Sequence, residues 1–335
     1  MAFIHDTTSN LAEIESRVIR MYEQHPFPSI KDKLRKAEIE MPLRLALLGI
    51  KPNDYIGKAI LDAGCGTGEY SCWYAKHGGH VTGVDLSESS LEMASHYAHR
   101  EGIKHITFDK QSVLKLPFSD GSFDYVTSMG VLHHTPDPIG GFRELCRVLR
   151  PGGVILVSLY NKFGRLRHNV KQFIVRSLAG DDIDRRVVWA KRVFPRTCRS
   201  LQRNRGDEPE VILYDAFGIP HESQHTAGEV LRWFDLNEVA YMGSFGPLTI
   251  RDNVLALYLL QKEEFSSFQQ YFQGFSGVTR FINTLPQANS WLLRRRSVSE
   301  VVFDRPSSVS RGVIQLCWFV LGFKFSIFSV AGRKT

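Results

Sequence analysis

The chain has 335 residues, of which 43% are hydrophobic and 23% charged, and this balance excludes collagen-like, disordered and low-complexity proteins. Its length favours one large domain with insertions, or a domain with a cap. The net charge is +7, but residues 162–205 hold 13 Lys or Arg and three Asp, so the rest of the chain carries a net charge of −3. This basic segment could meet nucleic acid, an anionic membrane surface or an acidic substrate, or it could be a solvated helical face.

Cysteine usage and the two ends of the chain bear on its compartment. Five scattered cysteines without a C-x-x-C pair predict reduced thiols in a cytoplasmic protein. The first residues show no basic region followed by an apolar core, so no signal peptide is expected.

Residues 312–332 carry one charge, Lys324, and approach the length of a membrane span. Because Gly322 interrupts this stretch and residues 323–330 partly alternate, we expect a buried helix and strand there and no membrane span.

The first predicted element is an amphipathic helix over residues 10–24, with Asn10 as its cap. It ends in Tyr22-Glu-Gln-His-Pro-Phe-Pro28, where two prolines stop the helix. This entry is either a lid over a ligand, with Tyr22 facing it, or a simple packing helix. A second helical stretch is expected around residues 41–48.

A strand, a glycine turn and a helix follow one another within residues 59–77. Residues 59–63 predict a buried strand, Gly64, Gly66 and Gly68 come directly after it, and a helix is expected from 69 to 77. Glycines allow positive φ angles and close approach of a ligand, and a helix start offers free N–H groups to an anion. The turn therefore suits a nucleotide-like ligand, although a bare tight turn needs no ligand at all.

The next strand, residues 80–85, ends in an acid. Asp85 lies 17 positions after Gly68, and an acid about 20 residues past such glycines accepts hydrogen bonds from ribose hydroxyls. The alternative is that Asp85 caps the helix predicted over residues 87–101.

Three further strands complete an alternating pattern. Residues 105–109, 122–128 and 154–160 read as strands, and a helix over 143–150 is stopped by Pro151-Gly-Gly. Two adjacent histidines, His133 and His134, follow the second of these strands, where α/β active sites lie. Five strand–helix steps in order predict a doubly wound parallel sheet.

Beyond residue 160 the chain departs from a minimal domain. Residues 161–206 are expected to be a basic helical insertion, followed by a loop to residue 226 that contains His221 and His225. A helix over 228–236, a strand over 238–245 and a second insertion over 250–310, with Arg294 to Arg296 as its most polar part, precede a last strand near 323–332.

The motif Asp62-x-Gly64-x-Gly66-x-Gly68 resembles the first motif of the class I S-adenosylmethionine (SAM) dependent methyltransferases. Position 69 is Glu, which excludes the dinucleotide pattern G-x-G-x-x-G. The stretches Leu-Pro-Phe118, Ser-Phe-Asp-Tyr-Val126 and Val-Leu-His-His134 are similar to the group that includes the ubiquinone and menaquinone biosynthesis methyltransferases. Where these have an acid for the adenine amino group, this chain has Gln111 and Ser112.

The resemblance implies a seven-stranded, mostly parallel, Rossmann-like α/β sheet with helical insertions, its last strand antiparallel. It also implies a division of the chain into an N-terminal lid (1–54), a SAM-binding core (55–160), a basic insertion and loop (161–226), a core helix and strand six (227–249), a second insertion (250–310) and a final helix and strand seven (311–335). The residues expected to bind SAM are Tyr22, Asp62, Gly64, Cys65, Gly66, Gly68, Asp85, Leu86, Ser112, Val113, Ser128, Met129 and Gly130.

The acceptor side is less defined by the sequence. The candidates for catalysis are His133, His134, Tyr160 and His221, with His225 and Tyr22 beside them, and each is equally compatible with a structural role. No metal is expected. We predict methyl transfer to a small molecule, to O or N rather than C. Neither the Asp-Pro-Pro-Tyr or Asn-Pro-Pro-Tyr of enzymes that methylate nucleobase or amide nitrogens nor the Pro-Cys of cytosine C5 enzymes follows the fourth strand, which argues against these two nucleic-acid groups. The alternatives are an RNA methyltransferase that uses residues 162–205 and a SAM-binding protein without turnover.

Overall fold

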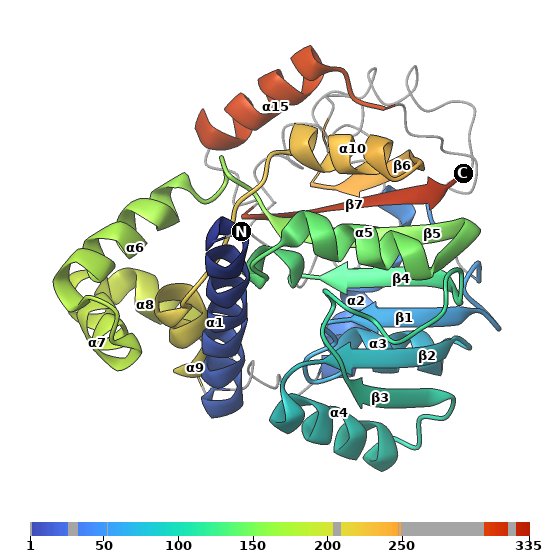
Figure 1. The fold of residues 1–335 in the computed structure, drawn as a ribbon, viewed down its shortest axis with the longest axis horizontal. Coiled ribbons are helices and arrows are strands. Elements are labelled where there is room, and N and C mark those ends of the chain that lie inside the picture. Colours follow the sequence, from blue (N-terminus) through green and yellow to red (C-terminus); the bar gives the residue numbers. More distant parts are fainter. Residues whose placement is uncertain are drawn as a thin grey trace, which may run out of the picture.

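The computed structural model describes residues 2–25, 33–51, 53–203, 209–246, 248, 305–320 and 326–335. Its centre is one sheet of seven strands in the order β3-β2-β1-β4-β5-β7-β6 (Figure 1). The strands are β1 (Ala59–Ala63), β2 (His80–Asp85), β3 (Ile106–Lys110), β4 (Phe123–Met129), β5 (Leu149–Tyr160), β6 (Val239–Phe245) and β7 (Ile327–Lys334). Strands β1 to β5 pair in parallel, and β7 runs antiparallel between β5 and β6. The predicted seven-stranded, mostly parallel fold is confirmed.

Two cores cover the two faces of this sheet, because neighbouring strand residues point to opposite sides. Leu61 and Ile155 face one core with α5 (Pro138–Val148) and α10 (Ala227–Leu236). Ile60 and Val154 face the other, with α2 (Lys33–Leu47) and α3 (Glu69–Lys76). The apolar runs of the strands are therefore explained by burial on both faces.

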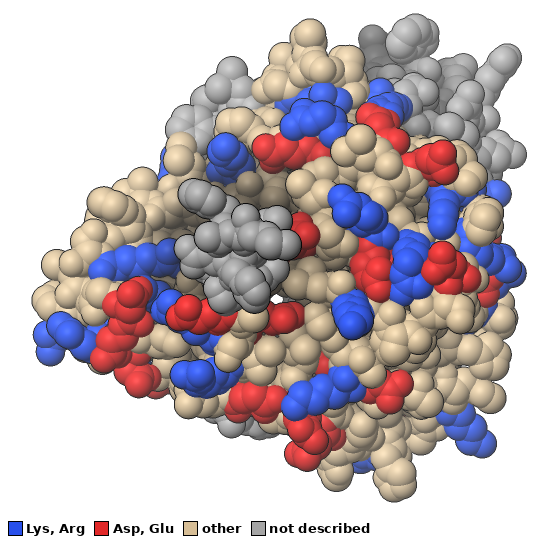
Figure 2. Space-filling view, in the orientation of Figure 1, with Lys and Arg blue, Asp and Glu red and all other residues tan. Residues whose placement is uncertain are grey.

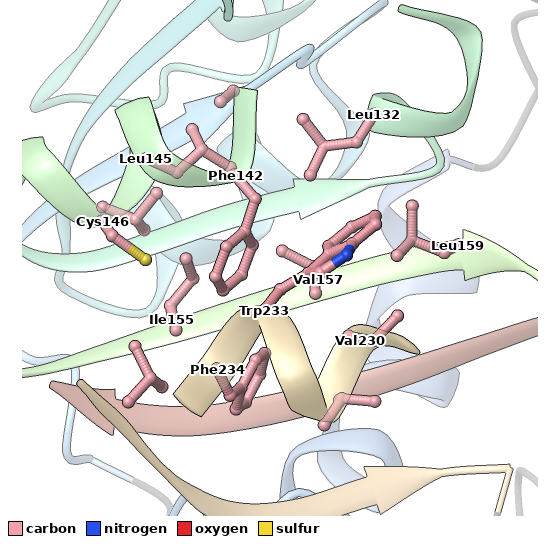
Figure 3. Close-up of a cluster of buried hydrophobic side chains, with 14 of the residues drawn as sticks. Leu132, Phe142, Leu145, Cys146, Ile155, Val157, Leu159, Val230, Trp233 and Phe234 are labelled. Atoms are coloured by element: carbon pink, nitrogen blue, oxygen red, sulfur yellow. The ribbon is translucent and has the colours of Figure 1, made fainter. Parts of the chain in front are cut away.

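The first core is fixed by aromatic packing between two helices far apart in the chain (Figure 3). The ring of Phe142 on α5 stacks on Phe234 of α10 with centroids 5.4 Å apart, and Trp233 lies 5.9 Å from the same ring. Thr226 begins α10 with a capping box, in which its side chain accepts from the backbone of Glu229 and the Glu229 carboxylate accepts in return. The sheet edge formed by β5, β7 and β6 is thus tied to the centre.

Several element boundaries differ from the sequence prediction. Helix α1 spans Ala2–Gln24, so Asn10 lies inside it and is not its cap; the cost of a polar residue in a helix interior is only a few tenths of a kcal/mol. Helix α4 (Glu88–Arg100) is capped by Ser87, whose side chain accepts from the backbone of Ser90, so Asp85 is not the cap. Helix α5 ends at Val148, and Pro151 lies in an irregular start of β5.

Residues 161–203 and 209–226, called the cap below, form a separate, mainly helical layer beside the carboxyl ends of the strands (Figure 1). It contains α6 (Leu166–Ala179), α7 (Ile183–Val193), α8 (Pro195–Gln202), α9 (Val211–Leu213) and the π-helical turn η2 (Tyr214–Gly218). These helices share their own apolar cluster around Val175, Val187 and Phe217. The basic segment is therefore helical, as expected.

At the C-terminus a helix, α15 (Ser308–Val320), is followed by β7, as expected. The strand is buried, but the helix is not buried as expected over its described side chains, because Val309 and Val313 are 77% and 44% exposed. Within the described part of the chain, no helix is both long and apolar enough to cross a bilayer. Residues 26–28 of the predicted lid entry and most of the second predicted insertion, including Arg294 to Arg296, lie outside the described residues.

Candidate active site

The glycine turn after β1 is open at one position and packed at two. Gly66 has a φ of +51° and nothing within 4 Å of the place where a Cβ would stand. A Cβ on Gly64 would lie 2.2 Å from a methyl group of Val131, and one on Gly68 would lie 2.8 Å from Ala94. The expectation that all three glycines leave room for a ligand therefore holds for Gly66, while the other two are needed for packing.

Two carboxylates lie beside this turn, the half-buried Asp85 and the buried Asp62. Asp85 accepts from the backbone N–H of Gly66 at 2.8 Å and of Ser87 at 2.9 Å, which leaves lone pairs on both oxygens. Burial raises its pKa. Asp62, 2% exposed, accepts from the hydroxyl of Ser71 on α3, and burial raises its pKa to about 6.

The loops after β2, β3 and β4 complete the edge. Leu86 is half-buried and Val113 is buried. The Ser112 hydroxyl donates to Glu15 on α1 at 2.7 Å and accepts from Leu114 N–H at 3.2 Å. The residue expected to read a base is thus already bonded to a carboxylate from the first helix.

Gly130 provides the second open backbone position, with a φ of +83° and nothing within 4 Å of its missing Cβ. The side chains next to it are turned inward. Ser128 is fully buried, and Met129 accepts through its sulfur from the Ser158 hydroxyl at 3.1 Å. The Cys65 side chain is also buried. Contacts of these residues with a ligand would have to come from their backbone.

A polar cluster faces this edge from the cap side. It consists of Tyr22, His133, His134, Tyr160, Arg165, Asp215 and Glu222, which come from α1, the 3₁₀ turn η1 (Leu132–His134), the end of β5 and the cap. Because η1 follows Val131, whose methyl groups fill the space beside Gly64, the cluster begins one step from the glycine turn.

Tyr22 connects α1 to the cap. Its hydroxyl donates to the Asp215 carboxylate at 3.0 Å, and its ring lies edge-on to His134 at 6.1 Å. Burial and the nearby Asp215 raise the pKa of Tyr22 well above its usual value, so the phenol keeps its proton. Glu23, next to it, accepts from the backbone of Glu88 at the start of α4. Helix α1 therefore lies against both the core and the cap.

The two adjacent histidines hold opposite tautomers. The backbone N–H of Tyr160 donates to His133 Nδ1 at 3.3 Å, so the proton of a neutral ring is on Nε2. His134 Nδ1 lies 3.3 Å from the backbone carbonyl of His221, which only accepts, so Nδ1 carries the proton and Nε2 has the lone pair. Burial, the largest cause, lowers the pKa of both histidines, and both rings are neutral near pH 7.

A buried ion pair encloses the cluster. Arg165 donates to both Glu222 oxygens, at 2.8 and 3.0 Å, and its guanidinium lies 3.6 Å from the centre of the Tyr160 ring. The other face of Tyr160 stacks on His133 at 3.7 Å. Burial raises the pKa of Tyr160 well above its usual value.

The remaining histidine candidates lie around the cluster. His221 contributes its backbone carbonyl to His134, and its own ring bonds to the backbone of Thr135. His225 bonds through its ring to the Ser223 hydroxyl at 2.9 Å and packs on Trp233. The structure therefore brings His133, His134, Tyr160 and Tyr22 together, and it places the His225 ring against α10.

The basic charge of the cap is partly neutralised. Arg186 pairs with Asp181 at 2.8 Å and Lys191 with Glu210 at 2.6 Å. On the face shown in Figure 2, Asp and Glu side chains alternate with Lys and Arg over the cap, at the left of the view. Among the residues that the structure describes, no uninterrupted basic surface extends over this face.

Comparison with known proteins identifies the family. Residues 61–157 match the methyltransferase domain family. A ubiquinone biosynthesis O-methyltransferase from Paracidovorax citrulli is 31% identical over 172 residues, which cover 50% of this chain and 69% of that protein. The chain belongs to the class I SAM-dependent methyltransferases. Its cofactor is SAM.

Two other similar proteins match over part of their length. The ubiquinone biosynthesis O-methyltransferase of Idiomarina loihiensis is 34% identical over 42% of this chain and 56% of its own. The solved structure of the YcgJ protein from Bacillus subtilis has a TM-score of 0.41 and 18% identity, over 69% of this chain and 86% of that one. This methyltransferase spans about half the length of most of the curated relatives it matches.

The backbone turns at Gly66 and Gly130, together with Asp62 and Asp85, are called the donor edge below. These residues fit SAM. Gly66 and Gly130 follow the neighbouring strands β1 and β4 and form a cradle that a Cβ would fill. The Asp85 carboxylate, at the end of β2 on the other side of β1, keeps free lone pairs for hydroxyl groups. Sequence reasoning missed Arg165, Asp215 and Glu222. Asp215 and Glu222 lie in the segment predicted as a loop. Their closeness in sequence to the candidate His221 was the only sign in the sequence that they belong to the site.

Proposed function

We propose that this methyltransferase transfers the methyl group of SAM to a hydroxyl oxygen of a small molecule held at the polar cluster. One observation carries the proposal: His134 is a buried, neutral imidazole whose Nδ1–H is held by a backbone carbonyl, so that its Nε2 lone pair is directed elsewhere. A hydroxyl must lose its proton as the new C–O bond forms, and a positioned histidine is the usual base. The relatives named O-methyltransferases support an oxygen acceptor.

The donor side would be held by Gly66, Gly130 and Asp85, with Asp62 beneath the turn. Bound SAM supplies an electrophilic methyl group on a sulfonium sulfur. The chain's own residues have to orient the acceptor, exclude water and take one proton. Helix α1 and the cap, which meet through Tyr22 and Asp215, are the parts that would cover the acceptor.

The proton would pass from the acceptor hydroxyl to His134 Nε2. Asp215 and Glu222 favour the imidazolium that results, since both carboxylates raise the pKa of His134 against the larger effect of burial. His133 is the poorer base, because its Nδ1 lone pair is occupied by the Tyr160 N–H and its Nε2 carries the proton. Arg165 and nearby histidines further disfavour a charge on His133.

The test uses methyl-labelled SAM with extracts of the source cells, divided into metabolite, RNA and protein fractions. Label in the metabolite fraction is expected, and the rate should be constant above pH 6.5 and fall at lower pH as His134 is protonated. His134→Asn should reduce the rate by about 100-fold or more without weakening SAM binding. His133→Asn, the matched variant, should keep the loss of rate at low pH.

Two results would reject the proposal. Label confined to RNA, with binding that weakens steeply as salt rises, would favour the RNA alternative. A His134→Asn protein as active as the wild type would remove His134 as the base even if the labelled product were a small molecule.

A further inference from the structure

A row of apolar side chains is exposed along α6 and the turn before it. Its members are Phe163, Leu166, Val170 and Phe173, which are 40%, 45%, 54% and 72% exposed. Spacings of three, four and three residues keep them on one face of the helix. The residues that α6 buries in the protein, Gln172, Val175 and Ala179, are offset so that they lie on the opposite face. Helix α6 therefore has a second apolar face, which the cap does not use.

The charged side chains that α6 and the turn before it contribute all have one sign. Residues 162–180 contain five Lys or Arg and no Asp or Glu. Lys162 and Arg167 are exposed and Lys171 is half-buried. At about 100° per residue, Arg167 and Lys171 lie along one side of the row, and Lys162 lies in the turn before the helix. The acidic residues of the cap begin at Asp181, after α6 has ended. Figure 1 shows α6 on the outside of the cap, beyond α1.

This combination favours one occupant over two others. RNA would be attracted by the basic side chains, but aliphatic side chains such as Leu166 and Val170 at the centre of the row offer nothing to phosphates. A second copy of the chain placed face to face would bring like charges together at the borders of the row. An anionic bilayer matches both parts, with acyl chains for the apolar row and lipid phosphates for the basic borders.

We propose that α6 is a docking surface for anionic membranes and lies in the plane of the interface. Because Arg165 is both the N-cap of α6 and a member of the polar cluster, the docked helix would begin at the place proposed for the methyl acceptor. The docking itself does not depend on the identity of the acceptor. Only its consequence, that a lipid-borne acceptor reaches the cluster from the bilayer, rests on the proposed function.

The experiment is co-sedimentation of the full chain with vesicles of phosphatidylglycerol and phosphatidylcholine, or of phosphatidylcholine alone. The wild type should bind the anionic vesicles and bind the neutral ones much more weakly. Val170→Ser with Phe173→Ser should reduce binding about tenfold or more, because each loses apolar area that the bilayer would bury. Lys162→Gln with Arg167→Gln should reduce it about fivefold per charge, and high salt should remove that difference.

The matched control is Leu236→Ser on α10, a side chain that is 77% exposed and far along the chain from α6. It should bind anionic vesicles like the wild type. The proposal would be overturned if the Val170→Ser, Phe173→Ser variant bound anionic vesicles as well as the wild type does, or if the wild type did not bind them. So would a wild-type dimer in sedimentation velocity that this double variant dissociates, because the row would then be an interface between copies. Without vesicles, the Val170→Ser, Phe173→Ser variant should label the metabolite fraction as the wild type does. A failure of docking can therefore be distinguished from a failure of the proposed reaction.

Discussion

The donor edge and the polar cluster lie side by side at the same ends of the strands, but they are built differently. The donor edge is formed by backbone: Gly66 and Gly130 are open because of local φ angles, and Asp85 is held by N–H groups within 20 residues of it. The polar cluster is formed by side chains from distant segments, such as Tyr22 with Asp215, 193 residues apart.

This difference predicts which changes each half tolerates. Changes that strain or fill the backbone should remove SAM binding and leave the cap intact. Changes that break a side-chain pair should weaken the cap and the acceptor side and leave SAM binding intact. The following variants test that separation.

The largest expected effect is on the cap. Arg165→Met leaves the buried Glu222 carboxylate without its charged partner, and removing one partner of a buried pair costs about 3–5 kcal/mol. The free energy of unfolding from denaturant titration should fall by that amount, and SAM affinity from calorimetry should change by less than about twofold. Arg305→Met, which breaks an exposed pair with Asp235, should cost less than about 1 kcal/mol. A loss of SAM affinity as large as the loss of stability would show that the two halves are not separate.

The second effect is on the donor edge. Gly66→Ala places a Cβ in the open cradle and forces a left-handed φ on alanine, which costs about 1–2 kcal/mol. We expect SAM affinity to fall about 100-fold as well. Gly102→Ala has a similar φ of +65° and open space at the end of α4, so it should show the strain alone. Equal SAM affinities for the two variants would contradict the cradle.

The same division explains what the sequence could predict. Strands β1 and β2, the glycine turn and Asp85 are contiguous or nearly so, and alternation with turn residues was enough to place them. That Gly64 and Gly68 serve packing could not be predicted, because Val131 and Ala94 approach them only in the folded chain. Ser112 was expected at the cofactor, but its bond to Glu15 depends on where α1 docks. The pairing of Arg165 with Glu222 could not be predicted either, because these residues lie in a basic segment and a loop that only the folded cap brings together.

A smaller effect is expected where α1 meets the cap. Tyr22→Phe removes the hydroxyl bonded to Asp215, and a hydrogen bond to a charged group contributes about 1.5–3 kcal/mol. Backbone amides of α1 should exchange with deuterium about tenfold faster or more. Tyr214→Phe removes the equivalent bond to Asp184 at an exposed position and should leave exchange in α1 unchanged. If both variants exchanged like the wild type, α1 would be held by its core contacts alone.

The smallest effect separates the halves by pH. His168 on α6 donates to the Ala216 carbonyl, and burial lowers its pKa to about 4. Since the unfolded chain binds this proton near pH 6.5, stability contributed by His168 is lost as pH falls from about 6.5 to 4. Asp62 has the opposite sign: its pKa is raised to about 6, so its contribution is largest below pH 4 and is lost as pH rises through 6.

Each group alone changes stability by at most about 1.4 kcal/mol per pH unit within its window. In denaturant titrations between pH 4 and 7, His168→Gln should lose less stability on acidification than the wild type, whereas Asp62→Asn should lose more. The direction of each variant's change in stability, relative to the wild type, is more informative than its size. If both variants changed in the same direction, at least one of the two pKa shifts would be absent. If the two variants change stability in opposite directions, the cap loses stability on acidification and the donor edge is the more acid-resistant half.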